Sequence, residues 1–93
     1  MPKISELVEK EALSPLQMKV LRYLNDHPDE VFSYRDEAEL AQKIEHSGSV
    51  HGIGFSLWAL EKKGLIGKEN YGRRVYFGSF QAINKLKEAK KKR

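Results

Sequence analysis

The stretch that decides the fold is residues 57–66, which read LWALEKKGLI. Its first two leucines follow Ile53 at spacings of four and three, which places all three side chains on one buried stripe of a helix. Gly64 comes directly after two lysines, and a glycine just past a basic last turn is a signal for the end of a helix. Because residues 65–66 are apolar and β-prone, the stretch predicts a helix that runs into a strand through one tight turn.

Downstream of this stretch, the sequence predicts a β-hairpin and a last helix. Residues 70–73 contain a glycine and are expected to form the turn, and residues 74–77 (RVYF) are typical of the returning strand. The tip is basic, because Arg73 and Arg74 are adjacent. Ser79 can cap a last helix that extends to about residue 92.

Upstream, residues 14–17 (SPLQ) are a strong helix start. Ser14 and Gln17 have the spacing of a capping box, and a proline suits the first helical turn. The pair His27-Pro28 is expected to end this helix, because the residue before a proline avoids the helical region. Residues 3–12 have the periodicity of a short amphipathic helix, which is either a free arm or a packing element for a partner.

A second core helix is predicted after a short strand at residues 31–34 (VFSY). Asp36 and Glu39 repeat the capping pattern at its start. Its inner face is expected to carry Leu40, Ala41 and Ile44. Residues 46–49 form a turn, and either Ser47 or Ser49 is expected to cap the third helix.

Length and composition restrict the class of protein. A chain of 93 residues fits one domain. It has no cysteine, which excludes disulfides and thiolate metal sites. No apolar run approaches the ~20 residues that span a bilayer, and residues 1–10 are too charged for a signal peptide. We therefore expect a cytoplasmic protein with no membrane partner, in the host cytoplasm if the chain is viral.

Charge is divided unevenly along the chain. Residues 1–48 hold six Lys and Arg against ten Asp and Glu, a net charge of −4, whereas residues 49–93 hold eleven against three, a net charge of +8. A basic half beside an acidic half favours a polyanion on one face, most simply nucleic acid. The alternative is an unevenly charged surface that is merely solvated.

The predicted order is helix, short strand, helix, tight turn, helix, hairpin, helix. This order resembles that of the winged helix-turn-helix family, and within the family that of the small MarR-like and ArsR-like regulators of bacteria, archaea and archaeal viruses. The resemblance is carried by residues 39–41 (ELA), 57–66 and 72–76 (GRRVY). The resemblance covers roughly residues 14–77. It implies an α+β, mainly α fold, with a three-helix core, a β-hairpin wing and extra terminal helices. We expect one domain over residues 1–93, with an N-terminal arm (1–13), a core (14–78) and a C-terminal helix with a basic tail (79–93).

The resemblance also implies a function, that of a double-stranded DNA-binding transcriptional regulator with no cofactor. Helix 50–63 is expected in the major groove, where each base pair shows a distinct pattern, and wing 67–76 on the minor groove or phosphates. Family members commonly dimerise through terminal helices, so we expect a homodimer, with packing within one subunit as the alternative. The expected dimer residues are Ile4, Leu7, Val8, Phe80, Ile83 and Leu86. The sequence leaves open whether a small-molecule effector binds.

The candidate DNA contacts lie on the third helix and on the wing. On the helix, they are the positions expected to face away from the buried stripe. His51 is expected at bases, phosphates or solvent, and Phe55 at a thymine methyl group or in the core. Arg73 and Arg74 are expected on opposite faces of a strand, with only one aimed at DNA. The full set is Ser49, His51, Gly52, Phe55, Ser56, Lys62, Lys68, Tyr71, Arg73 and Arg74.

The third helix departs from the family pattern, because it lacks Arg, Asn and Gln, the residues best suited to bidentate base reading. Gly52 and Gly54 each cost a helix about 1 kcal/mol relative to alanine. They either permit close approach to DNA or make the helix begin late. Trp58 is expected to pack in the core, with the wall of a ligand pocket as the alternative.

Two other functions remain open at this stage. The same fold can serve as a protein-interaction module, or as an architectural protein that binds DNA without sequence preference. An enzyme is the least favoured class, because the sequence contains no catalytic motif and its three histidines lack metal-ligand spacing.

Overall fold

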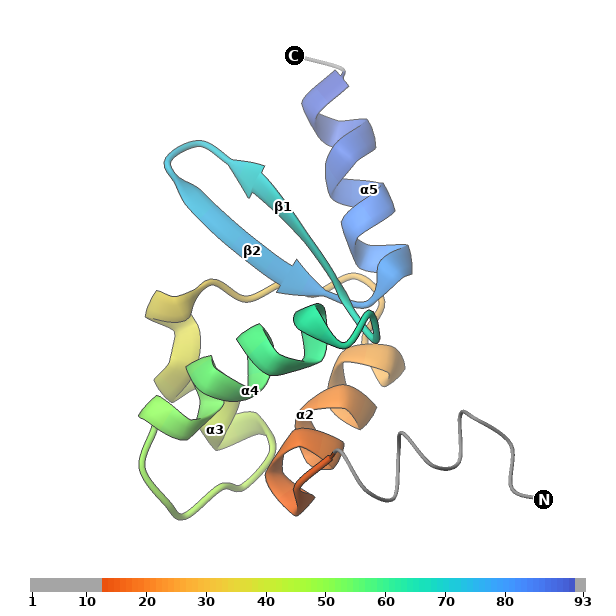
Figure 1. Cartoon of the computed structure of the whole chain (residues 1–93). Coiled ribbons are helices and arrows are strands. Elements are labelled where there is room, and N and C mark those ends of the chain that lie inside the picture. The colour runs from red at the N-terminus through yellow and green to blue at the C-terminus, as the bar shows by residue number, and fades with distance from the viewer. Residues whose placement is uncertain (1–12, 92–93) are drawn as a thin grey trace, which may run out of the picture.

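A two-stranded hairpin stands above a group of helices in the computed structural model, which describes residues 13–91 (Figure 1). This part of the chain is α+β and mostly helical, with an element order compatible with a winged helix. The predicted helix at residues 3–12 and the end of the basic tail lie outside the described residues. The elements are α2 (Pro15–Asp26), the 3-10 turn η1 (Tyr34–Asp36), α3 (Glu37–Lys43), α4 (His51–Lys62), β1 (Gly67–Tyr71), β2 (Arg74–Gly78) and α5 (Phe80–Lys91).

Helix α2 begins and ends where its capping residues predict. The Ser14 hydroxyl accepts from the Gln17 backbone N–H at 3.2 Å, and the Gln17 side chain accepts from the Ser14 N–H at 3.3 Å, so the capping box is confirmed. Pro15 is the first helical residue. The helix ends at Asp26, just before His27-Pro28.

The segment before α3 differs from its prediction. Instead of a strand over residues 31–34, a single antiparallel bridge joins Phe32 to Phe77 through two backbone hydrogen bonds of 2.9 and 2.8 Å. The Asp36 carboxylate accepts from the backbone N–H of Ser33 at 2.8 Å and from its hydroxyl at 3.0 Å. Asp36 makes no side-chain cap on α3, so the predicted capping box with Glu39 is wrong. The aspartate instead stabilises the turn that precedes the helix.

The turn between α3 and α4 starts in the left-handed region. Glu45 has a φ of 56°, and the His46 N–H donates to the Ala41 carbonyl at 2.8 Å, which together close the end of α3. The Ser49 hydroxyl accepts from the His51 N–H at 3.3 Å. Ser49 therefore satisfies one backbone donor at the start of α4, which begins at His51.

The hairpin is shifted slightly from its predicted position. β1 begins at Gly67 rather than at residue 65, and Tyr71 pairs with Arg74 across a two-residue loop of Gly72 and Arg73. Gly72 has a φ of 65° and Arg73 has no positive φ. A positive φ at the first loop residue alone is typical of a type II′ turn, whose twist matches that of the flanking strands.

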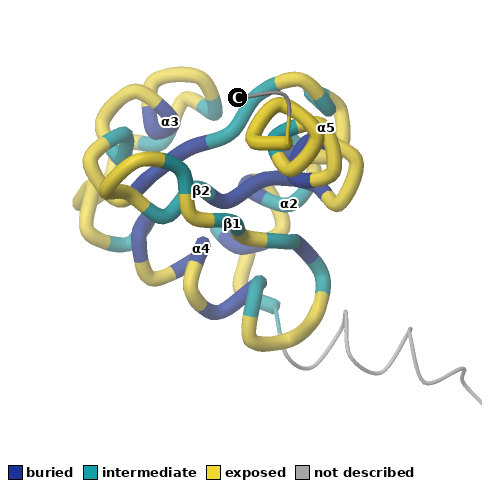
Figure 2. The backbone as a smooth tube through the Cα atoms, turned by 90° about the horizontal axis from the view of Figure 1, so that it is seen from above, coloured by how far each residue is buried: buried dark blue, intermediate teal, exposed yellow. Residues whose placement is uncertain are grey.

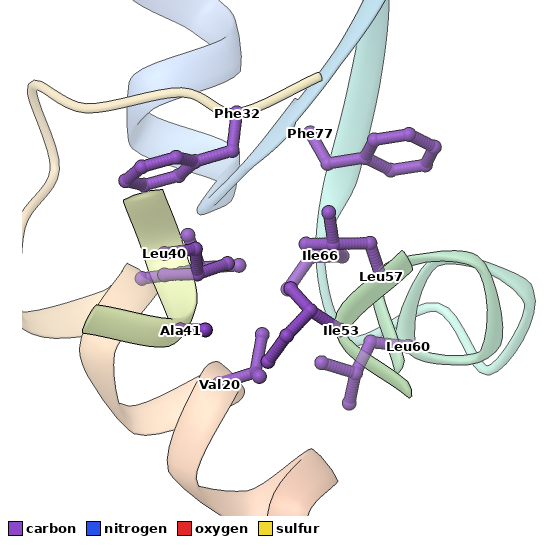
Figure 3. Close-up of a cluster of buried hydrophobic side chains, with 10 residues drawn as sticks. Val20, Phe32, Leu40, Ala41, Ile53, Leu57, Leu60, Ile66 and Phe77 are labelled. Carbon is purple, nitrogen blue, oxygen red and sulfur yellow. The ribbon is translucent and has the colours of Figure 1, made fainter. Parts of the chain in front are cut away.

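One core joins the helices to the base of the hairpin. Figure 2 shows that buried backbone runs through the middle of the molecule, with exposed backbone around it. The buried cluster draws on α2, α3, α4, the Phe32 bridge and the hairpin, and Figure 3 shows its side chains gathered between these elements. The cluster contains Val20, Leu24, Phe32, Leu40, Ala41, Ile53, Leu57, Leu60, Ile66 and Phe77. The predicted stripe of Ile53, Leu57 and Leu60 is thus confirmed, and it fixes which face of α4 points outward.

Candidate nucleic-acid interface

The outward face of α4 is a single row of four exposed residues, His51, Phe55, Trp58 and Lys62. Their spacings of four, three and four residues place them on one side of the helix, opposite the buried stripe. The structure therefore places the predicted contacts His51, Phe55 and Lys62 together. We call these four residues the α4 outer row.

Two predicted members of this face point elsewhere. Ser56 is only 2% exposed and donates its hydroxyl to the Gly52 carbonyl at 2.8 Å, so it belongs to the packed side of α4. Gly52 faces α2, because a Cβ there would lie 3.2 Å from the Leu16 side chain. The expectation that both residues lie on the outward face is wrong, since α4 packs against α2 along that side.

Gly54 brings α3 close to α4. Its backbone N–H donates to the Glu37 carboxylate at 2.9 Å, and a Cβ at this position would lie 2.5 Å from the same oxygen. The prediction of a late helix start is wrong, because α4 begins at His51, and close approach to DNA stays a prediction for both glycines. They allow the neighbouring helix and a carboxylate to approach the backbone of α4.

Trp58 lies on the surface, so its predicted place in the core is wrong. Its side chain is 47% exposed, and that of its neighbour Phe55 is 60% exposed. The centroids of the two rings are 5.7 Å apart, with their planes tilted by 34°. The outer row therefore carries a pair of contacting aromatic rings, flanked by His51 and Lys62.

The hairpin tip contributes a basic groove. Arg73 and Arg74 line the same groove of about 230 Å³, although alternation along a strand predicts that they point to opposite faces. They converge because Arg73 lies in the turn and only Arg74 is in the strand. Within residues 13–91, neither arginine takes part in an ion pair.

Sequence reasoning missed two residues of this groove, Tyr34 and Arg35, which come from η1. Arg35 adds a third cation from a segment that is about forty residues away in sequence and carries no basic cluster of its own. The sequence does not predict the place of Tyr34 and Arg35 in the groove, because the β-prone residues 31–34 favour a strand rather than a turn next to the hairpin. We call the groove lined by Arg35, Arg73 and Arg74 the arginine groove.

Tyr34 connects the arginine groove with α4. Its ring lies 5.1 Å from that of Phe77, centroid to centroid, and a Cβ on Gly54 would lie 3.3 Å from its Cδ1. Gly54 and Trp58 are four residues apart, so they are neighbours along the surface of α4. Trp58 in the outer row therefore lies next to the helix position that Tyr34 covers.

The remaining predicted contacts are Lys62, Lys68 and Tyr71, and they differ in how they are engaged. Lys68 forms an ion pair with Glu61 at 2.8 Å, which joins β1 to α4, and its hydrogen bond to that carboxylate raises the pKa of the lysine. Lys63 donates to the Gln17 side chain at 3.2 Å, while Lys62 is exposed on the outer row. Tyr71 is half-buried at the end of β1. Lys68 thus links β1 to α4, and its predicted contact with DNA stays a prediction.

The predicted dimer residues are only partly available. Ile83 is 3% exposed, and it packs beneath the hairpin, where a Cβ on Gly67 would lie 3.1 Å from its side chain. Its predicted role in a dimer interface is therefore wrong. Leu86 is half-buried, whereas Phe80 is 54% exposed. Ile4, Leu7 and Val8 lie outside the described residues.

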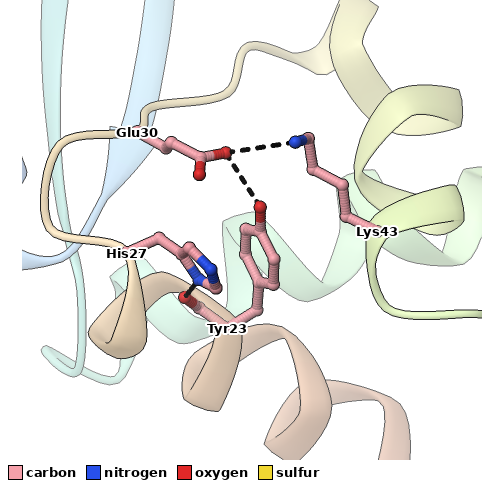
Figure 4. A network of polar contacts seen from close by, with 4 residues as sticks. All are labelled: Tyr23, His27, Glu30 and Lys43. Carbon is pink, nitrogen blue, oxygen red and sulfur yellow. Dashed lines mark hydrogen bonds and ion pairs between the residues drawn. The ribbon is translucent and has the colours of Figure 1, made fainter.

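A polar network ties α2 to α3 on another side of the molecule (Figure 4). The Tyr23 hydroxyl donates to Glu30 at 2.9 Å, and Lys43 lies 3.6 Å from the same carboxylate oxygen. His27 stacks on Tyr23, with ring centroids 3.9 Å apart. Burial and then the hydrogen bond to Glu30 raise the pKa of Tyr23 above its ordinary value. The network stabilises the junction of the two helices.

Residues 13–91 contain neither a metal-ligand cluster nor a helix suited to a bilayer. Across this range, no three histidine, aspartate or glutamate side chains gather as a metal site requires. The helices in the same range are all too short or too polar to cross a membrane.

Comparisons of the chain with protein families, with characterised proteins and with solved structures give no match.

Proposed function

We propose that this chain is a winged helix-turn-helix protein that binds double-stranded DNA and regulates transcription. In this proposal, α4 enters the major groove with its outer row toward the bases, and the arginine groove receives the sugar-phosphate backbone. A helix of this kind fits the major groove, and arginine is well suited to phosphate. The homodimer expected from the family resemblance is part of the same proposal.

The observation that carries the proposal is the arginine groove. Arg35, Arg73 and Arg74 line one groove although they come from segments far apart in sequence. Three arginines on one groove supply the positive charge that attracts a polyanion, which supports the proposal. Tyr34 lines this groove and also lies against Gly54 of α4, which supports simultaneous contact with a groove and a backbone of DNA.

The test is a salt titration of duplex binding. Fluorescence anisotropy with a labelled 24-base-pair duplex of mixed sequence gives the affinity at several salt concentrations. The slope of log affinity against log salt is negative, and its magnitude decreases by about 0.9 for each phosphate that the protein ceases to neutralise. We expect the double variant Arg73→Ala with Arg74→Ala to weaken binding and to lower the slope by up to about twice that amount.

A matched control removes the same charge elsewhere. Lys19 and Arg22 are both exposed on α2 and line a different groove, next to Tyr23 and Ile44. We expect Lys19→Ala with Arg22→Ala to leave the slope nearly unchanged. Equal effects of the two double variants would mean that only net charge matters, and absence of binding at low salt would refute the proposed function.

A second candidate function, a protein-interaction module, is favoured by the aromatic pair. Phe55 and Trp58 expose large apolar surfaces of the kind found at the centre of protein interfaces. In that case, the chain would bind no duplex at low salt, and alanine variants of the pair would abolish capture of a protein partner. The arginine groove is why we place DNA first.

A further inference from the structure

The outer row of α4 is unusual for a surface that reads DNA, because its largest members are apolar. Phe55 and Trp58 are the two middle residues of the row and are 60% and 47% exposed. Their rings contact each other across one helical turn, with centroids 5.7 Å apart. Together they form one continuous apolar ledge along the outer side of the helix.

The charges around the ledge select the kind of partner that covers it. The row has no carboxylate, and its last residue is Lys62. Two acidic residues are already engaged, since Glu61 of α4 pairs with Lys68 and Glu37 of α3 accepts the N–H of Gly54. The arginine groove lies beyond Tyr34. Lys62 and the arginine groove favour a polyanion as the partner. The apolar ledge favours a polyanion that presents an apolar group at the bottom of a groove.

Duplex DNA has one such group. The C5 methyl of thymine is the apolar feature of the major groove, and every other feature of the base edges there is a hydrogen-bond donor or acceptor. The outer row holds no Arg, Asn or Gln, so it lacks the side chains that pair with guanine or adenine in a bidentate manner. Its polar members, His51 and Lys62, stand at the two ends of the row.

We propose that Phe55 and Trp58 together read thymine methyl groups, so that this protein selects duplexes by the pattern of methyls in the major groove rather than by bidentate hydrogen bonds. This inference rests on the proposed function and names the substrate class that it prefers, namely thymine-rich double-stranded sites. Cytosines methylated at C5 present the same group at the same edge of the base, so they are bound in the same way.

The experiment changes only the methyl groups. Anisotropy is measured on a 24-base-pair duplex of A·T pairs, and on the same duplex with every thymine replaced by deoxyuridine, which keeps all hydrogen-bonding groups. A methyl that is buried on binding contributes about fourfold in affinity, so the wild-type chain is expected to bind the thymine duplex about four- to fifteen-fold more tightly. A G·C duplex is expected to gain affinity when its cytosines are methylated at C5.

The double variant Phe55→Ala with Trp58→Ala assigns the effect to the ledge. Both side chains are exposed, so the variant is expected to fold, and it should bind the thymine and uracil duplexes equally while keeping the salt slope of the wild type. The variant with Arg73→Ala and Arg74→Ala is expected to have a lower overall affinity but to keep its preference for thymine.

The outcomes separate the inference from the function on which it rests. If the wild-type chain binds both duplexes equally, methyl reading is wrong while DNA binding stands. If it binds neither duplex at low salt, both are wrong. The variant Phe55→Ala with Trp58→Ala could instead change the oligomeric state and leave the ratio of the affinities for the thymine and uracil duplexes unchanged. In that case the ledge is a contact between copies of the chain, and the inference is overturned.

Discussion

The Glu37 carboxylate lies 2.9 Å from the backbone nitrogen of Gly54, and this contact sets how closely α3 approaches α4. Glu37 is in the first turn of α3, and Gly54 is the fourth residue of α4. The negative carboxylate is therefore close to the positive end of the α4 dipole. A side chain at residue 54 would occupy the space that the carboxylate fills.

A double-mutant cycle tests this contact. Gly54→Ala in the wild-type chain displaces the Glu37 carboxylate, and the absence of its hydrogen bond outweighs the gain in helix propensity, for a net destabilisation of about 1 kcal/mol. With Glu37→Ala in the background, the same change is expected to stabilise by up to about 1 kcal/mol. Urea unfolding of the four proteins measures the cycle. An effect of Gly54→Ala with the same sign in both backgrounds would contradict the proposed role of the contact.

Arg35 is expected to behave as a member of the arginine groove. Arg35→Ala should reduce the slope of log affinity against log salt by about 0.9 for a duplex, because one phosphate is then no longer neutralised. Salt titration checks this, with Arg22→Ala on α2 as the control of equal charge. A slope that stays at the wild-type value would exclude Arg35 from the interface even if Arg73 and Arg74 remain in it.

Tyr23 is expected to make stability depend on alkaline pH. Its pKa is raised above the ordinary 10.0, first by burial and then by the hydrogen bond to Glu30. Because the pKa is higher in the folded chain than in the unfolded chain, the stabilisation is fully present below the pKa of the unfolded chain. It is lost as the pH rises through the pKa of the folded chain. Near neutral pH, the free energy of unfolding of the wild type should exceed that of Tyr23→Phe by about 1 kcal/mol. This difference should close above pH ~10. Urea unfolding across this range tests it, and a constant gap would refute it.

Phe80 is the one exposed member of the predicted dimer set within residues 13–91. If the last helix builds the dimer, Phe80→Glu should shift sedimentation velocity from dimer toward monomer, because a charge would be buried without a partner. Lys85→Glu is the control, since that residue is exposed on the same helix. A dimer that withstands Phe80→Glu would place the interface elsewhere.

The helices and the hairpin could be predicted because their signals are local. Ser14 with Gln17, Gly64 and Ser79 each act within a few residues, and the structure has the corresponding helix start, stop and start. The prediction for residues 31–34 was wrong because their partner, Phe77, is far away in sequence. A β-prone run becomes a strand only where a neighbouring edge has room for it, and here a single bridge forms.

The candidate interface was only half predictable for the same reason. Periodicity identifies the buried stripe of α4, but it does not say how far the stripe extends to either side. Ser56 and Trp58 both border it, yet the serine is buried while the tryptophan stays exposed. Arg35 could not be predicted because only the folded chain brings η1 beneath the wing. Pairing of Lys68 with Glu61 likewise depends on the approach of β1 to α4.

The bridge between Phe32 and Phe77 has a mechanical consequence. A hairpin attached only by its ends is free to swing, and a two-stranded hairpin alone is barely stable in water. Here the second strand is fastened by two backbone hydrogen bonds to the segment that leads into η1. A pull on the wing is therefore transmitted to Arg35 and the start of α3 as well as to α4. The bridge thereby fixes the position of the second strand relative to the segment that carries Arg35.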